Sequence, residues 1–132
     1  MVRPEVTPYT KGMAAVYYAA AELSERGYIV TTTARNAPKV DILVTTPDMK
    51  KTFNVQVKTT THSYWIIKDA KKAVSPNFLY IFVKFKGKQK PDFYIVKSTK
   101  VARNINIYRS KNAVWPCFSP DEKDKDRWNL LR

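Results

Sequence analysis

PKVDILVTTPDMKKTFNVQVKTT, residues 38–60, has the pattern of two β-strands joined by a turn. Alternation of apolar and polar side chains predicts strands at 40–46 and 52–58, with turn-forming residues between them. Successive side chains of a strand point to opposite faces, so Gln56 and Lys58 share the polar face of the second strand. An ordinary hairpin has no need of an amide and a lysine placed in this way.

The pairing of the two strands brings a carboxylate to the same place. If Thr46 lies opposite Lys51, the antiparallel register sets Asp41 opposite Gln56 and diagonally adjacent to Lys58. A shift of one residue would move Asp41 to the other face, so the prediction depends on the register. The hairpin is therefore expected to gather three polar side chains on one face.

These three side chains suit work on a phosphodiester. Asp41 is a hard oxygen ligand of the kind that Mg²⁺ prefers, and Gln56 can add or orient a further ligand. Lys58 can stabilise the negative charge that develops on phosphorus, or position an attacking water. The simpler interpretation of the same residues is a surface salt bridge beside a glutamine.

A helix is expected at residues 8–26. Thr7 and the proline after it are a typical helix start, and Gly27 suits the position just past the end. Its predicted buried stripe consists of Met13, Val16, Tyr17, Ala20 and Leu23. Glu22 and Glu25 are expected on the opposite, solvent-facing side.

The rest of the chain alternates strands with short helices. The predicted elements are strands at 28–33, 63–68, 78–85 and 93–96, a loop at 34–38, a short helix at 69–74, a helix from Ser98 to about Tyr108, and a last helix in the tail. This order predicts one α/β domain over residues 1–132, with a central mixed β-sheet flanked by helices.

The charge is concentrated in the middle of the chain. The formal net charge is +13, and residues 50–111 hold fifteen Lys or Arg against two Asp or Glu, while the flanks are balanced. Such a field attracts DNA, RNA or an anionic membrane surface, although a soluble protein can also simply be basic. The predicted phosphate contacts are Lys84, Lys86, Lys88, Lys90 and Arg103.

Several classes of protein are disfavoured. The single cysteine, Cys117, excludes an intrachain disulfide and a cysteine zinc cluster. The N-terminal residues lack the apolar run of a secretory signal, and no segment approaches the roughly 20 apolar residues of a membrane span. A cytoplasmic protein without a membrane partner is therefore expected.

The remaining aromatic residues and the lone histidine have simple interpretations. Trp65 could stack on a base, but core packing is favoured. Trp115 and Trp128 are expected to anchor the tail. His62 follows Lys58 by four residues and could approach the same site, although a surface position is the favoured interpretation.

The order of the first helix, GYIV, PKVDILV and FNVQVKT resembles the PD-(D/E)xK nuclease superfamily, whose fold is restriction-endonuclease-like. It is similar to archaeal Holliday-junction resolvases and to modified-DNA restriction enzymes, some of which carry Q-x-K. The resemblance covers residues 11 to about 60 and, more loosely, DFYIVKSTKVA. It implies Asp41, Gln56 and Lys58 as catalytic residues, Asp41 and Gln56 as ligands of Mg²⁺ or Mn²⁺, DNA as the substrate, and a homodimer.

The sequence departs from this family at one position. Resolvase-like members place a metal-binding glutamate four residues after a lysine-glycine pair, and here Lys11-Gly12 puts Val16 there. Two hypotheses follow: a metal-dependent DNA endonuclease of branched or duplex DNA, or a weakly active or inactive nuclease-fold module that binds DNA or RNA. An RNA- or ribosome-associated protein is a third.

Overall fold

The computed structural model describes residues 4–33 and 39–132, so the predicted loop at 34–38 lies outside the described residues. The strands are β1 (Ile29–Thr32), β2 (Ile42–Thr45), β3 (Thr52–Thr60), β4 (Trp65–Ile66), β5 (Phe78–Lys86), β6 (Gln89–Lys97), β7 (Asn106–Ser110) and β8 (Ala113–Phe118). The helices are α1 (Pro8–Glu25) and α2 (Ser98–Arg103), with 3₁₀ turns at Ala70–Lys72, Glu122–Asp124 and Trp128–Leu130.

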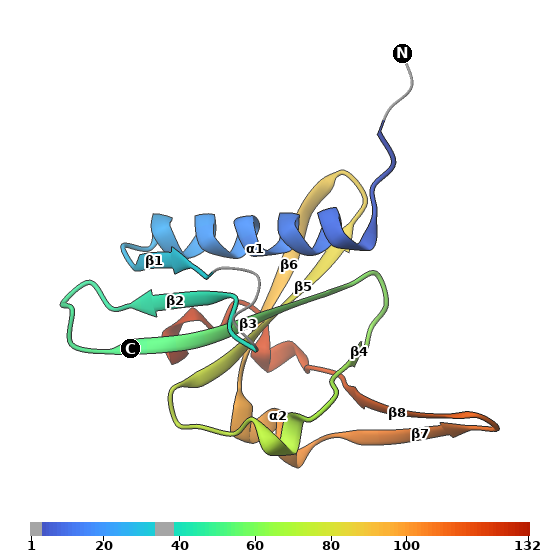
Figure 1. Cartoon of the computed structure of the whole chain (residues 1–132). Helices are drawn as coiled ribbons and strands as arrows, with labels where there is room; N and C mark the ends of the chain where they lie inside the picture. Colours follow the sequence, from blue (N-terminus) through green and yellow to red (C-terminus); the bar gives the residue numbers. More distant parts are fainter. Residues whose placement is uncertain (1–3, 34–38) are drawn as a thin grey trace.

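The strands form two sheets. The central sheet has the order β1-β2-β3-β5-β6, in which β3 and β5 are parallel and the other neighbours antiparallel. α1 covers one face, while α2 and the small sheet β4-β8-β7 lie on the other (Figure 1). The predicted mixed α/β sheet flanked by helices is confirmed. Among the described residues, no helix is long and apolar enough to cross a membrane.

β5 is buried on both faces of the central sheet. Leu79 and Ile81 pack with α1 in what we call the helix-side core. Tyr80 and Phe82 point the other way, into a far-side core that also contains Trp65. Trp65 packs against Phe82 with tilted rings whose centroids are 5.0 Å apart, and it is 3% exposed, so the core interpretation of this residue is confirmed.

α1 begins and ends where the sequence predicts. The Thr7 side chain accepts the Thr10 N–H at 3.1 Å, and the Thr10 hydroxyl accepts the Thr7 N–H at 3.0 Å, which forms a capping box. Gly27, just past the C-cap, has φ +89°, a left-handed conformation that glycine adopts at little cost. Local chemistry therefore accounts for both ends of the helix.

The buried face of α1 is rotated from the predicted stripe. The buried residues are Ala15, Val16, Ala19, Glu22 and Leu23. Tyr17, predicted as core, is 60% exposed, and Glu22, predicted to face solvent, is 8% exposed. Glu22 can be buried because Arg26, one turn later, bonds its Oε2 at 2.6 Å and Lys90 of β6 bonds its Oε1. Glu25 is exposed as expected.

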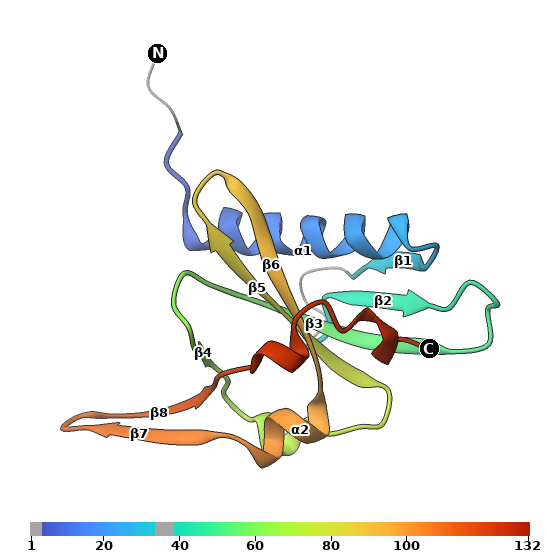
Figure 2. The same cartoon turned by 180° about the vertical axis from the view of Figure 1, so that it is seen from behind.

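The chain after β6 differs most from the predicted elements. The helix expected from Ser98 to about Tyr108 ends at Arg103, and β7 and β8 then form an antiparallel hairpin that projects from the body of the protein (Figure 2). β8 also pairs with Trp65 and Ile66 of β4. The extended conformation is therefore stabilised by a partner about fifty residues away, which local helix signals cannot report.

Three shorter predictions also change. The predicted strand at 63–68 is reduced to the two residues of β4, and the helix at 69–74 to one 3₁₀ turn. The tail has two 3₁₀ turns in place of an α-helix. Trp128 packs against Phe93 and anchors the tail as predicted, but Trp115 is 44% exposed on β8 and does not.

Glu22 should make the stability of the fold depend on pH. Burial opposes its ionisation, but hydrogen bonds from Lys90 and Arg26 outweigh burial and hold its pKa below the ordinary 4.5. A lowered carboxyl pKa stabilises the fold above the unfolded-state pKa, and the contribution is lost as the pH falls through the folded-state value. We expect Glu22→Gln to reduce the free energy of unfolding by about 1 kcal/mol at pH 7, because both cations are partly solvated.

Urea denaturation of wild type and variant at pH 7 and near pH 3 measures this effect. The difference between the two proteins should shrink at the lower pH. Glu25→Gln, an exposed change on the same helix, should leave the unfolding midpoint unchanged at both. A Glu22→Gln difference that is the same at both pH values would contradict the ion-pair explanation.

Candidate active site

β2 and β3 pair in the predicted register, with Ile42 opposite Val55 and the ladder continuing to Thr45 and Thr52. Asp41 lies one residue before β2 and departs from the ladder. Its N–H donates to the Val55 carbonyl at 2.9 Å, and its Oδ2 accepts the Val57 N–H at 2.8 Å. The carboxylate therefore occupies the place of a ladder carbonyl at the end of the hairpin, and the expected ladder pair with Gln56 is not formed.

Asp41 and Lys58 interact electrostatically in a partly desolvated place. Burial raises the pKa of Asp41 above its usual 3.8, and the Val57 N–H and the Lys58 charge only partly oppose this. Burial lowers the pKa of Lys58 below its usual 10.5, with Asp41 acting against it. Two opposite charges whose ionised forms are both disfavoured by burial are typical of a functional site.

Asp41 opens into a cavity of about 440 Å³ between α1, the end of β1 and β3. Its wall is formed by Pro8, Tyr9, Gly12, Met13, Val16, Tyr17, Thr32, Thr33, Asp41 and Val57. Val16, where the resemblance implies a glutamate, lines the same cavity as Asp41 and presents only its isopropyl group. The N-terminal half of α1 forms the wall of the cavity opposite Asp41, but it supplies no second carboxylate.

Lys58 lines a neighbouring cavity of about 510 Å³ at the end of β3, together with His62 and Tyr64. Val57 belongs to the walls of both cavities, so they meet at this residue. His62 is exposed as favoured and stacks on Tyr64, with ring centroids 5.5 Å apart. Asp41 and Lys58 thus line two different cavities that have Val57 in common.

Gln56 lies farther from this meeting point. Val55 and Val57 face the helix-side core, so Gln56 and Lys58 point to the opposite face, as predicted for the pair. Gln56 is half-buried beside Tyr80 of β5 and lines neither of the two cavities. Asp41 instead lines the cavity on the α1 side of the sheet, so the three polar side chains are not gathered on one face as predicted. Asp41 and Lys58 still interact electrostatically.

The available donors limit how a metal could bind. Within residues 4–33 and 39–132, no group of three His, Cys, Asp or Glu side chains could hold an ion. Asp41 offers one carboxylate, whose Oδ2 accepts the Val57 N–H. Its Oδ1 is the oxygen that would bind an ion. Mg²⁺ is commonly held by one or two carboxylates, with water and substrate phosphates completing its shell. Asp41 alone therefore fits Mg²⁺ only if substrate phosphates supply further ligands.

The predicted phosphate contacts lie in two places: Lys84, Lys86, Lys88 and Lys90 on the β5–β6 hairpin, and Arg103 at the end of α2. Two of the four lysines have acidic partners within the protein. Lys86 pairs with Asp92 at 3.0 Å, and Lys90 pairs with Glu22, which β6 brings next to α1. Lys88 is exposed in the turn of the hairpin. These roles stay predictions.

A cluster of exposed aromatic residues was missed in the sequence. Tyr108 of β7 lies directly opposite Trp115 of β8, and Tyr64 precedes β4 in the same small sheet. The signal is present in 106–118, where NIYRS and AVWPCF are strand-like and flank a polar turn at Lys111-Asn112. The helix predicted from Ser98 to about Tyr108 overlapped the start of this segment, so its strand-like pattern was not recognised.

Comparisons with known proteins support the fold. No protein-family model matches the chain, and no curated protein matches it. Among solved structures, the chain is similar to a bacterial homing endonuclease, I-Ssp6803I, with a TM-score of 0.62 and 14% sequence identity. The match covers 96% of this chain and 92% of that chain. At this identity the similarity shows a shared, nuclease-like fold and leaves activity to be argued from the site.

Asp41 should reduce stability at neutral pH. Its pKa is raised by burial, so its contribution to stability is greatest below the unfolded-state pKa and declines as the pH rises through the folded-state value. Asp41→Asn keeps an oxygen that can accept the Val57 N–H and removes the desolvated charge. We expect the variant to be more stable than wild type at pH 7, with the difference vanishing below about pH 4.

Urea unfolding at a series of pH values tests this expectation. Asp69→Asn, a change at an exposed aspartate, is the matched control and should show no such pH-dependent gain. An Asp41→Asn protein that is less stable than wild type throughout would mean that the carboxylate is structural.

Proposed function

We propose that this protein is a divalent-metal-dependent endonuclease that hydrolyses phosphodiester bonds of duplex or branched DNA. The observation that carries the proposal is the desolvated Asp41 and Lys58 at the end of the β2–β3 hairpin. Its position within a nuclease-like fold adds support. A pair of this kind reduces stability, which favours a chemical role over a structural one.

Asp41 would bind Mg²⁺ or Mn²⁺ through its carboxylate, with water and substrate phosphate oxygens completing the shell, because Gln56, the other predicted ligand, points to the opposite face of the sheet. When bound, the metal neutralises phosphate charge and lowers the pKa of water. The Lys58 ammonium would donate hydrogen bonds to a non-bridging phosphate oxygen as negative charge develops, or hold the attacking water. Because Lys58 is half-buried, solvent competes less for those hydrogen bonds than at an exposed lysine.

The charge distribution favours a nucleic acid as substrate. All of the formal excess of +13 arises in residues 50–111, which include the β5–β6 hairpin and Arg103. Lys88 is exposed at the tip of that hairpin, where it is available to phosphate. Two protomers related by a two-fold axis would present one active site to each strand of a duplex, and we therefore propose a homodimer.

A second function is a nuclease-fold module that binds DNA or RNA without cutting it. Val16 and Gln56 favour it, because each is uncharged where a nuclease of this fold usually has a carboxylate. Such a module would bind nucleic acid in a salt-sensitive way and would not require Asp41.

Cleavage of supercoiled, linear and branched DNA with Mg²⁺ or Mn²⁺ decides between the two. We expect metal-dependent nicking that falls at least about 100-fold in Asp41→Asn and in Lys58→Ala, by loss of the metal ligand and of the phosphate-stabilising charge. Asp69→Asn and Lys50→Ala, changes at exposed residues of the same types, should cut at the wild-type rate.

Two results would count against the endonuclease. DNA binding without cleavage under any metal, unchanged by Asp41→Asn, supports the binding module. Cleavage that survives both Asp41→Asn and Lys58→Ala would place the active site elsewhere. Competition between DNA and RNA of equal length separates an RNA-associated role.

Val16→Glu should strengthen metal binding. Val16 and Asp41 line one cavity, so the substitution places a second carboxylate towards the same space. We expect Mn²⁺ affinity, measured by isothermal titration calorimetry, to rise about tenfold or more relative to Val16→Gln, which has the same size without the charge. Without metal the Glu variant should melt at a lower temperature than the Gln variant, and Mn²⁺ should remove that difference. Equal Mn²⁺ affinity in the two variants would contradict a metal site at this cavity.

A further inference from the structure

The small sheet presents one of its faces to the far-side core and the other to solvent. Phe118 and Trp65, which are paired across β8 and β4, point into the core. Strand alternation therefore directs Tyr108, Trp115 and Ile66 to the outer face. These three residues and Tyr64 are between 39% and 59% exposed, and we call the four together the aromatic surface.

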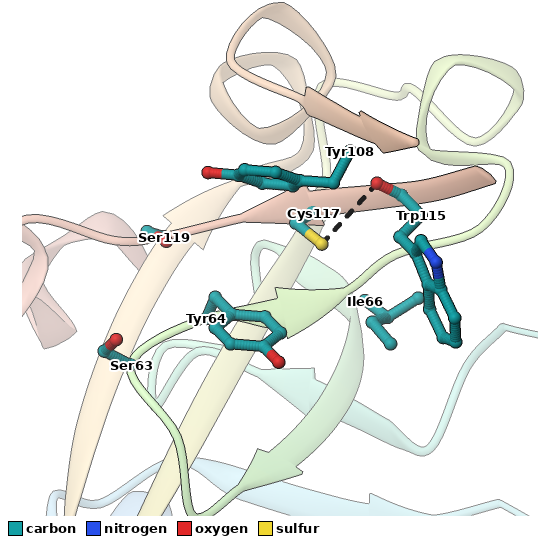
Figure 3. A pocket seen from close by; sticks show the side chains of 7 residues that line it. All are labelled: Ser63, Tyr64, Ile66, Tyr108, Trp115, Cys117 and Ser119. Carbon is teal, nitrogen blue, oxygen red and sulfur yellow. Dashed lines mark hydrogen bonds between the residues drawn. The ribbon is translucent and has the colours of Figure 1, made fainter. Parts of the chain in front are cut away.

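The aromatic surface surrounds a cavity of about 540 Å³ (Figure 3). Tyr64 and Trp115 lie on opposite sides of it, with Ile66 between them and Tyr108 above, while the Cys117 sulfur lies at its centre. Ser63 and Ser119 add hydroxyl groups to the rim. A cavity with several aromatic walls and a polar rim suits a flat, partly polar ring.

This cavity connects with the candidate active site. It shares Tyr64 and Ile66 with the cavity that contains Lys58. That cavity in turn shares Val57 with the one that contains Asp41. A ligand chain that contacts Lys58 can therefore reach the aromatic surface through neighbouring cavities.

The chain segments that build the aromatic surface carry only basic charges. The two segments that build it, 61–68 and 103–119, contain four basic residues and no Asp or Glu. The basic residues are Lys68, Arg103, Arg109 and Lys111. A second copy of this chain docked on the same surface would bring like-charged segments together, which is unfavourable. A ligand that combines negative charge with aromatic rings matches the surface better.

We propose that the aromatic surface binds unstacked nucleobases of a single-stranded or frayed nucleic acid strand, whose backbone continues towards Lys58. Tyr64, Tyr108 and Trp115 would stack on the bases, which is tolerant of sequence because every base has a flat π-face. The surrounding Lys and Arg residues would contact the phosphates. The inference rests on the proposed function for the class of ligand, but it does not require that the strand be cut.

Tryptophan fluorescence gives a direct readout. Trp65 and Trp128 are 3% and 7% exposed, whereas Trp115 is 44% exposed, so quenching by an added base reports Trp115. The full chain is titrated, with EDTA present to exclude metal, against single-stranded oligothymidylate, a duplex of equal length, and heparin as a polyanion without bases. We expect oligothymidylate to quench the fluorescence and heparin to bind without quenching.

Substitutions on the two faces of the hairpin separate stacking from charge. Tyr108→Ala and Tyr64→Ala should each weaken oligothymidylate binding about tenfold or more, and leave heparin binding within twofold of wild type. Val114→Ala is the matched control, because Val114 is 55% exposed on the same hairpin and has the opposite strand parity to Trp115. It should bind both ligands as wild type does.

Three outcomes would overturn the proposal. Oligothymidylate could fail to quench Trp115, or Tyr108→Ala could bind it as tightly as Val114→Ala. In the third, light scattering would show that Tyr108→Ala splits an oligomer, which would make the surface an interface between copies. Quenching in a protein that shows no nuclease activity would support the base-binding site and contradict the endonuclease. Cleavage without quenching would support the endonuclease and contradict the base-binding site.

Discussion

The burial of β5 on both faces is the constraint on which the rest of the structure depends. A strand that presents Leu79 and Ile81 to one side and Tyr80 and Phe82 to the other needs a cover on each. α1 supplies the first. The second comes from the crossover between β3 and β5, from α2 and from the small sheet, because a parallel connection needs a long excursion over one face. The β7–β8 hairpin is held where it is by this second cover, and beyond the core it projects into solvent (Figure 2).

The same arrangement creates the candidate active site. β3 runs parallel to the buried β5, so its end and Lys58 are partly removed from water. Asp41 precedes the first ladder pair of β2, and its carboxylate accepts a hydrogen bond from the Val57 N–H of β3. The attraction between the two charges does not fully compensate their desolvation, so the pair reduces the stability of the fold. Val16 leaves the opposite wall apolar, which makes substrate phosphate the natural source of the missing metal ligands.

Charge and shape point to one kind of partner. In the β5–β6 hairpin, Lys86 pairs with Asp92 and Lys90 pairs with Glu22. These two lysines therefore stabilise the fold, and only part of the basic excess is available to a ligand. The segments of the small sheet carry basic residues and no acidic ones, together with exposed rings and a cavity that adjoins that of Lys58. Phosphate binding at one end and base stacking at the other are the two requirements of a protein that handles a nucleic acid strand.

The sequence by itself determined the features that depend on neighbouring residues. The limits of α1 follow from the Thr7 cap and Gly27, and the β2–β3 register follows from the turn and the two-residue period of a strand. Tertiary structure decided the burial of Glu22, the shift of Asp41 out of the ladder, and the extended conformation of 106–118. Each of these is stabilised by a group far away in sequence: a lysine of β6, a backbone N–H of β3, and the ladder with β4. Local propensity depends only on neighbouring residues. It therefore cannot report partners that come together only in the folded chain.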